Sequence, residues 1–226
     1  MSPQMITTTP VRNANSKYRL FGAKGSGSAA VEFLLGELGV EHEVLDAAPW
    51  TDPPGPAFAE LQGISKYAQL PTLMAPGGEV LTESVAILWS LLERHPSGWV
   101  PVADRRARAA CLRWMTFIAG NVYSAIGIVD YPERWLAEPS QHEPLRAGAK
   151  GRIALAWRTL ADQWQGTPYF LGAAPTILDV YAANISRWSG ARAALRATHP
   201  QVLALLERVE ASPDVAGVWA RHWPSS

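Results

Sequence analysis

The chain of 226 residues has one cysteine, no excess of charge of either sign and no long apolar segment. Because a disulfide needs two cysteines, the lone Cys111 excludes an intramolecular disulfide, and together with a polar start it favours the reducing cytoplasm. Twenty Lys and Arg residues balance twenty Asp and Glu residues, so no net field attracts nucleic acid or an anionic membrane. No segment approaches the roughly 20 apolar residues that span a bilayer. The sequence therefore predicts a soluble cytoplasmic protein with a small-molecule partner, and neither a nucleic acid nor a membrane partner.

Sequence motifs for metals, nucleotides and a cysteine nucleophile are also missing. The five histidines are scattered, without Cys or carboxylate neighbours at metal-ligand spacing, so we expect no metal site. Gly22, Gly25 and Gly27 do not form a Gly-x-Gly-x-x-Gly fingerprint, and no Gly-Lys-Ser or Gly-Lys-Thr step marks a phosphate-binding loop. Cys111 falls on the apolar face of a predicted helix, which favours a buried, inert thiol.

Composition and periodicity divide the chain into four parts. Residues 1–16 are rich in Ser, Thr, Asn and Pro and are predicted to be a flexible N-terminal extension. Residues 17–95 alternate strand and helix patterns, whereas residues 105–226 have helical patterns throughout. The intervening residues 96–104 contain two prolines and a glycine, a composition typical of a linker. We therefore expect an α/β domain followed by an all-helical domain.

The first half of the α/β part follows a strand-helix-strand order. Residues 18–22 and 42–45 are predicted strands, and residues 28–38 between them carry apolar side chains on one helical face. This order predicts a parallel strand pair with a right-handed crossover. A second helix is predicted near residues 56–63, after a proline-rich loop.

The second half of the α/β part combines a proline-marked strand, a hairpin and a helix start. Pro71 cannot donate a ladder hydrogen bond, so it marks a strand entry, and a cis Leu70-Pro71 bond would turn the Leu70 backbone outward, toward a peptide ligand. Residues 76–78 turn the chain into a return strand. Residues 82–84 then open a helix, whose free N–H groups can bind an anion.

The second part of the chain is predicted to be a set of packed helices. A capping box forms where Thr176 caps a helix and Asp179 reaches back to its N–H, and this helix is predicted to continue through Trp188. Apolar residues at spacings of three and four predict the other helices, near residues 107–126, 149–164, 201–210 and 213–222.

These segments resemble the glutathione S-transferase family, in particular its cytosolic, bacterial-type members. The thioredoxin-like domain of that family carries a Val-Pro pair before a hairpin and then a Glu-Ser or Asp-Ser step, which Leu70-Pro71 and Glu83-Ser84 match. The step from Thr176 to Asp179 is similar to the capping motif in the helical domain of the family. The resemblance implies an N-terminal thioredoxin-like domain of β-α-β-α-β-β-α order, followed by a C-terminal helical-bundle domain.

The resemblance also implies a binding site for glutathione as co-substrate. In the family, the residue before the cis proline pairs with the cysteinyl backbone, and the acid and serine hold the γ-glutamyl amino and carboxylate groups. These roles pass to Leu70, beside Pro71, and to Glu83 and Ser84, with Gln69 as a candidate for the glycinyl carboxylate. The alternative interpretation is local: Thr82 is an ordinary N-cap, the acid complements the helix dipole, and the proline starts an edge strand.

Glutathione chemistry requires a thiolate, because an ordinary cysteine thiol is mostly protonated at neutral pH. In the family, the stabilising group lies between the first strand and the first helix. The hydroxyl donors here are Ser26 and Ser28, and backbone N–H groups are the third possibility. Ser28 is also a suitable N-cap, which favours Ser26 as the donor. The positions of the usual catalytic Ser, Cys or Tyr fall on Gly25 or Gly27, which have no side chain to donate.

Four aromatic residues are candidates for an apolar pocket that receives the second substrate: Trp50, Tyr123, Tyr131 and Trp135. The function implied is a glutathione S-transferase that conjugates the glutathione thiolate to an electrophilic, largely apolar small molecule. A glutathione-dependent lyase or isomerase is the enzymatic alternative. A non-catalytic, transferase-like interaction protein is the other, which the two loop glycines favour. The resemblance also implies a symmetric homodimer.

Overall fold

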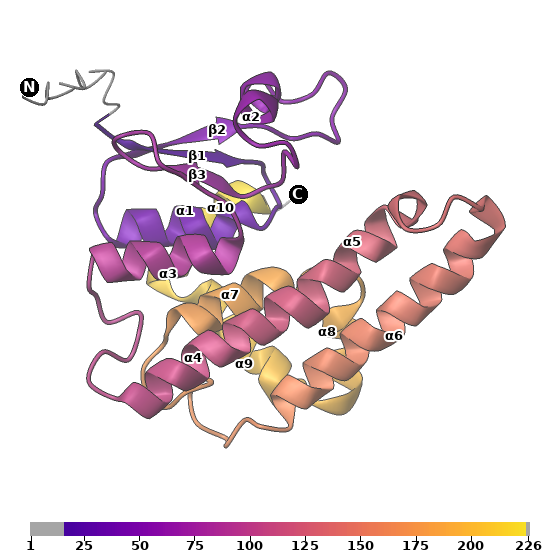
Figure 1. Ribbon diagram of the computed structural model, residues 1–226. Helices are drawn as coiled ribbons and strands as arrows, with labels where there is room; N and C mark the ends of the chain where they lie inside the picture. Colours follow the sequence, from indigo (N-terminus) through magenta and orange to yellow (C-terminus); the bar gives the residue numbers. More distant parts are fainter. Residues whose placement is uncertain (1–15, 225–226) are drawn as a thin grey trace, which may run out of the picture.

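The computed structural model describes residues 16–224, so the predicted N-terminal extension lies outside the described residues except for Ser16 (Figure 1). The first part of the chain has the predicted thioredoxin-like order β-α-β-α-β-β-α. Its elements are β1 (Tyr18–Gly22), α1 (Ser28–Glu37), β2 (His42–Asp46), α2 (Phe58–Ile64), β3 (Thr72–Met74), β4 (Val80–Leu81) and α3 (Ser84–Arg94).

The strands form one mixed sheet in the order β2-β1-β3-β4. β1 pairs with β2 in parallel, as predicted, and with β3 in antiparallel, with Phe21 opposite Thr72. Successive residues of a strand point to opposite faces, so Leu20 joins the main core and Phe21 joins a smaller core with Leu61. The helices α1 and α3 lie on one side of the sheet and α2 on the other (Figure 1). The end of β1 and the start of β3 therefore lie side by side.

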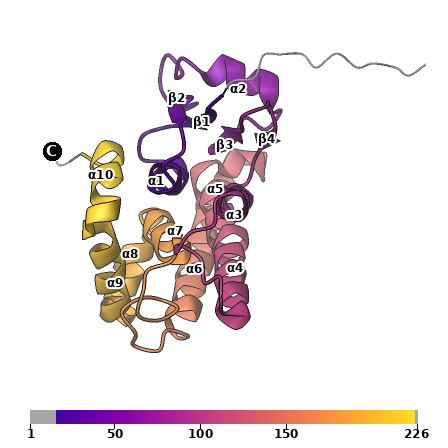
Figure 2. The same ribbon diagram turned by 90° about the vertical axis from the view of Figure 1, so that its left-hand side faces the viewer.

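The helix α1 is buried on every side over its first eight residues, although the sequence predicts one apolar face. The reason is its position between the sheet and the second part of the chain: α3, α7 and α10 all pack against it. Figure 2 shows α10, near the end of the chain, beside α1. The N-terminal end of α1 thus lies where both parts of the protein meet.

The second part is helical, as predicted. Its elements are α4 (Arg105–Ile118), the π-helical turn η1 (Ala119–Tyr123), α5 (Ser124–Asp130), the short 3-10 turns η2 (Pro132–Arg134) and η3 (Pro139–Gln141), α6 (His142–Ala161), α7 (Ile177–Ile185), α8 (Ala191–Thr198), α9 (Pro200–Ala211) and α10 (Pro213–His222). The capping box at the start of α7 is confirmed: the Thr176 N–H and hydroxyl both donate to the Asp179 carboxylate at 2.8 Å.

Three helix predictions need correction. The predicted helix over residues 107–126 is interrupted by η1, because a π turn leaves the apolar spacing intact and is invisible to periodicity. The helix α7 ends at Ile185 and not at Trp188: Ser186 is its C-cap residue, and the Ser186 hydroxyl donates to the carbonyl of Ala183. In addition, the helix α8 was not predicted.

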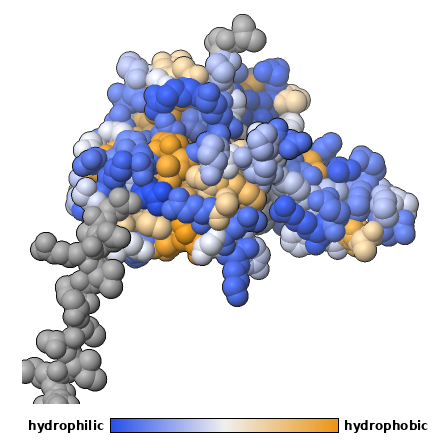
Figure 3. Space-filling view, turned by 90° about the horizontal axis from the view of Figure 1, so that it is seen from above, coloured by the Kyte–Doolittle hydropathy of each residue, from blue (hydrophilic) through white to orange (hydrophobic). Residues whose placement is uncertain are grey.

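The helices α5 and α6 pack together and project from the body as an arm (Figure 1). Seen from above, this arm is largely hydrophilic, whereas apolar side chains gather in a band across the middle of the body (Figure 3). None of the helices within residues 16–224 has the length and apolar character needed to cross a membrane.

Candidate functional site

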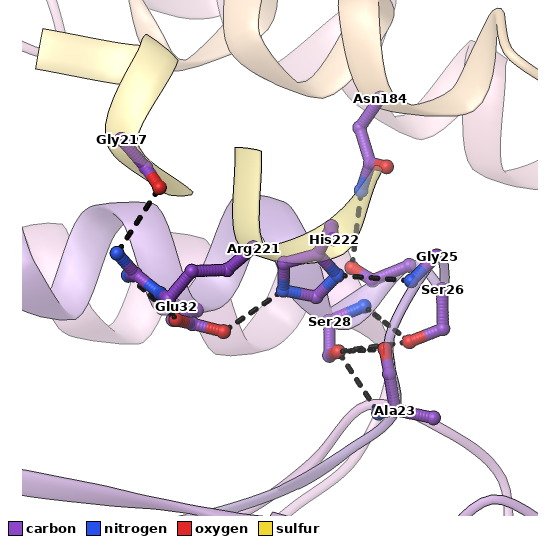
Figure 4. Close-up of polar contacts among 10 residues, drawn as sticks. Ala23, Gly25, Ser26, Ser28, Glu32, Asn184, Gly217, Arg221 and His222 are labelled. Atoms are coloured by element: carbon purple, nitrogen blue, oxygen red, sulfur yellow. Dashed lines mark hydrogen bonds and ion pairs between the residues drawn. The ribbon is translucent and has the colours of Figure 1, made fainter. Parts of the chain in front are cut away.

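The loop between β1 and α1 is held by side chains from the helical part of the chain (Figure 4). The N–H of Gly25, a residue with a φ of +65° that favours glycine, donates to Nδ1 of His222 at 3.2 Å. Asn184 of α7 donates from Nδ2 to the carbonyl of Gly27 at 3.3 Å. The loop conformation therefore depends on α7 and α10 as well as on its own residues.

The hydroxyls of Ser26 and Ser28 lie 2.8 Å apart inside this loop. Ser26 accepts the N–H of Ser28 at 3.2 Å, and the Ser28 hydroxyl contacts the backbone N–H and carbonyl of Ala23, both at 3.3 Å. The prediction that Ser28 caps α1 is wrong. Gly27 is the N-cap, and the Ser28 hydroxyl is turned away from the helix toward Ala23. Ser26 instead accepts the first N–H of the helix, that of Ser28.

A buried ion cluster anchors the C-terminal helix to α1. Glu32 accepts two hydrogen bonds from Arg221, at 2.9 and 2.7 Å, and one from Nε2 of His222 at 2.8 Å. Because Gly25 donates to Nδ1, Nε2 carries the ring proton and donates to the carboxylate. Burial pushes the pKa of Glu32 upward, but the bonds from His222 and Arg221 outweigh it and hold that pKa below its usual range.

The Leu70-Pro71 bond is cis, as predicted. Pro71 is buried, Leu70 is partly buried and Gln69 is exposed. The hydroxyl of Thr72 donates to the Gln69 carbonyl at 2.8 Å, which fixes the chain just before β3. Because β3 runs antiparallel to β1, this segment lies beside the β1-α1 loop.

At the start of α3, Glu83 is exposed and Ser84 is buried. Glu83 is the N-cap residue with a φ of +63°, and within residues 16–224 no side chain caps the first turn. The local interpretation, in which Thr82 is an ordinary N-cap, is therefore wrong. The hydroxyl of Ser84 lies 3.0 Å from the hydroxyl of Tyr181 on α7, and burial raises the pKa of that tyrosine above its ordinary value.

The aromatic residues predicted to line a second pocket differ in their surroundings. Trp50 and Trp135 are 53% and 60% exposed. Tyr131 lies under the guanidinium of Arg134, at 3.9 Å from its ring centre. Tyr123 instead faces the β1-α1 loop, with its ring stacked on Trp188 at 6.1 Å. Their role in substrate binding stays a prediction.

Comparison with known proteins gives a consistent result. Residues 20–99 match the family model described as glutathione S-transferase, N-terminal domain. The chain is 26% identical over 204 residues to the uncharacterised GST-like protein YncG of Escherichia coli, covering 90% of this chain and 98% of YncG. Residues 20–99 therefore form a domain of the glutathione S-transferase N-terminal type. These matches agree with the resemblance on which the fold prediction rested.

Solved glutathione S-transferase structures share the fold of this chain. A glutathione transferase homologue from Sulfitobacter with bound glutathione superposes with a TM-score of 0.76, at 21% identity, over 90% of this chain and 97% of the other. A transferase from Methylobacterium radiotolerans in complex with glutathione sulfonate gives a TM-score of 0.70, at 22% identity, over 92% and 96% of the two chains.

Three of the site features come from the helical part of this protein and were not predicted. Asn184 of α7 contacts the β1-α1 loop, and Tyr181 of the same helix contacts Ser84. His222 of α10 contacts both the loop and Glu32. Each of these contacts joins residues that are at least 97 positions apart, so no local pattern indicates them. The histidines lack metal-ligand spacing in the sequence, and this pattern gave no sign that one of them, His222, positions a loop.

Proposed function

We propose that this protein is a glutathione transferase that binds glutathione beside the β1-α1 loop and directs its thiolate at an electrophilic, largely apolar small molecule. The observation that carries the proposal is the start of α3. Glu83 has a disfavoured backbone conformation and makes no cap there, and residues of this kind persist chiefly at functional sites. The cis Leu70-Pro71 bond beside the same loop supports the proposal.

Each predicted binding residue contacts a different group of glutathione. The backbone of Leu70 pairs with the cysteinyl residue, Glu83 accepts from the γ-glutamyl amino group, and Ser84 donates to the γ-glutamyl carboxylate. If the Tyr181 hydroxyl donates to Ser84 Oγ, the Ser84 proton is left free for that carboxylate. Gln69 is exposed beside this segment and is proposed for the glycinyl carboxylate.

The proposed reaction forms one carbon-sulfur bond. The thiol proton leaves to solvent, the thiolate attacks the electrophilic carbon, and the leaving group departs with its electron pair. The N-terminal end of α1 stabilises the thiolate through the positive end of its dipole. Ser26 and Ser28 remain candidate donors, although their hydroxyls are engaged within the loop.

One observation favours a second candidate function, that of a glutathione-binding interaction protein without turnover. Gly25 and Gly27 leave the family's usual catalytic positions without side chains, and both serine hydroxyls have partners in the loop. Such a protein would bind glutathione and leave its thiol protonated. The pKa of bound glutathione separates the two functions.

Bound glutathione is expected to titrate well below the ordinary thiol pKa of about 8.5. Calorimetry establishes binding, and the ultraviolet absorbance of the thiolate, followed across pH, gives the pKa. Binding with an ordinary pKa would support the interaction protein, and absence of binding at millimolar glutathione would contradict both functions. Free glutathione in the same buffers is the control.

We also propose that the protein is a symmetric homodimer of the cytoplasm. Large apolar side chains on the first domain are exposed in the single chain, among them Trp50, Tyr67 and Val80. An isologous contact with the helical domain of a second copy would cover such residues. Light scattering is expected to give twice the mass of one chain, and a monomer at micromolar concentration would contradict the proposal.

A further inference from the structure

The side chain of Tyr123 occupies the space in which Gly27 would carry its own side chain. A Cβ atom built on Gly27 would lie 2.1 Å from the Tyr123 hydroxyl oxygen and 2.9 Å from the ring carbon that bears it. Both distances are shorter than real Cβ contacts, so this ring position requires glycine at residue 27. Gly27 is also one of the two positions at which the family resemblance leads us to expect a catalytic Ser, Cys or Tyr.

The hydroxyl of Tyr123 lies between the two backbone segments that the proposed function places around the cysteinyl residue. On one side is Gly27, at the N-terminal end of α1. On the other side is the carbonyl oxygen of Leu70, to which the hydroxyl donates at 3.5 Å, the long limit of a hydrogen bond. The cysteinyl N–H of a bound glutathione would donate to this carbonyl in place of Tyr123. The tyrosine O–H would then be free to donate to another acceptor.

The π-helical turn η1 explains how a residue of the helical domain reaches this position. Tyr123 is the last residue of the turn, and π turns of this kind occur frequently at functional sites. Its ring stacks on Trp188 with an interplanar angle of 6°, so the hydroxyl has little freedom to leave the loop. The geometry is therefore fixed before a ligand arrives.

The protonation of Tyr123 suits a donor. Burial raises the pKa of Tyr123 to about 12, the carboxylates of Asp130 and Glu83 act in the same direction, and the Gly27 backbone opposes them. The hydroxyl consequently keeps its proton throughout the neutral range. By contrast, the hydroxyls of Ser26 and Ser28 are already bonded to each other and to the loop backbone.

We propose that Tyr123 donates the hydrogen bond that holds the glutathione thiolate, in place of the side chain that Gly27 lacks. This inference rests on the proposed function and names the thiol-activating residue of that same site. Tyr123 transfers no proton: the thiol proton leaves to solvent, and the tyrosine hydroxyl stabilises the sulfur anion.

The test is the pKa of bound glutathione in Tyr123→Phe, read from thiolate absorbance. A hydrogen bond to a charged group corresponds to about one to two pKa units, so the pKa is expected to rise by that amount. The rate of reaction with a nitro-activated aryl chloride at neutral pH should fall about 10- to 100-fold. Tyr169→Phe, a partly buried tyrosine in the loop before α7, is the matched control and should match the wild type.

A second variant guards against a purely structural effect. Gly27→Ser alone should bind glutathione poorly, because its Cβ collides with Tyr123. In the double variant with Tyr123→Ala, the side chain of residue 27 no longer collides with the tyrosine ring, and its hydroxyl lies where the tyrosine hydroxyl was. The double variant should therefore again lower the pKa of the bound thiol. Tyr123→Ala alone should not.

The outcomes separate this inference from the proposed function. If the wild type binds no glutathione, the proposed function fails and the inference with it. If the wild type lowers the thiol pKa and Tyr123→Phe leaves it unchanged, the function stands and the inference is overturned. Ser26→Ala and Ser28→Ala, measured alongside, would then identify a serine donor if either raises the pKa.

Discussion

Glu32→Ala is expected to lower the free energy of unfolding by about 1.5 to 3 kcal/mol, because it leaves the buried Nε2–H of His222 without its carboxylate acceptor. Glu32 and His222 are 8% and 6% exposed, so water cannot replace the lost contact readily. Urea denaturation at pH 7 measures the difference. Glutathione affinity should fall as well, since His222 holds the N–H of Gly25 in the loop.

Arg221→Ala is the matched control for Glu32→Ala. Arg221 donates two hydrogen bonds to the same carboxylate, but 59% of its side chain is exposed, and exposed ion pairs contribute at most about 1 kcal/mol. Arg221→Ala should therefore lower the free energy of unfolding much less than Glu32→Ala does. Its glutathione affinity should stay close to that of the wild type. Equal losses in the two variants would contradict the buried His222 contact as the cause.

The pH dependence of this cluster has a definite sign. The pKa of Glu32 is lower in the folded protein than its ordinary value of 4.5, so the folded state favours the ionised carboxylate. The resulting stability is fully present above pH 4.5 and is lost as the pH falls through the folded-state pKa. The difference in the free energy of unfolding between the wild type and Glu32→Gln should thus become smaller as the pH falls below the folded-state pKa of Glu32. A gap that widens would reverse the assignment.

Features encoded within a few residues were predictable from the sequence. The cis Leu70-Pro71 bond and the capping box of Thr176 and Asp179 depend on short patterns, and both are confirmed. The π turn η1 was not predictable, because residues 118, 122 and 126 keep their spacing of four and all are buried. α8 was missed, although Ala191 and Leu195 lie four positions apart and are both buried.

The candidate site was predictable only on the side contributed by the thioredoxin-like domain. Asn184 and Gly27 are 157 positions apart, and His222 and Gly25 are 197 positions apart. Such contacts arise when α7 and α10 pack on α1, and packing of this kind leaves no periodic trace in the sequence. The same limit applies to Tyr123, whose contact with the loop at Gly27 no local pattern indicates.

Glu83→Gly is expected to weaken glutathione binding by about 10- to 100-fold and at the same time to stabilise the folded protein. Loss of a hydrogen bond between charged groups corresponds to roughly 1.5 to 3 kcal/mol, and each 1.4 kcal/mol is tenfold in affinity. The stability gain follows from the backbone, because the φ of +63° is disfavoured for glutamate and open to glycine. Relief of about 1 to 3 kcal/mol of strain exceeds the 0.5 to 1 kcal/mol of extra chain entropy that glycine loses on folding.

Glu83→Ala separates the two effects. Alanine removes the carboxylate but keeps the Cβ atom, so the affinity should fall as in Glu83→Gly while the stability stays near that of the wild type. Calorimetry with glutathione and urea denaturation of the three proteins give both quantities. If Glu83→Gly bound glutathione as the wild type does, the carboxylate would have no part in the site. If glycine gave no stability beyond alanine, the conformation of residue 83 would carry no strain. The expected pattern, a strained residue whose replacement stabilises the fold and weakens the ligand, is that of a position kept for binding.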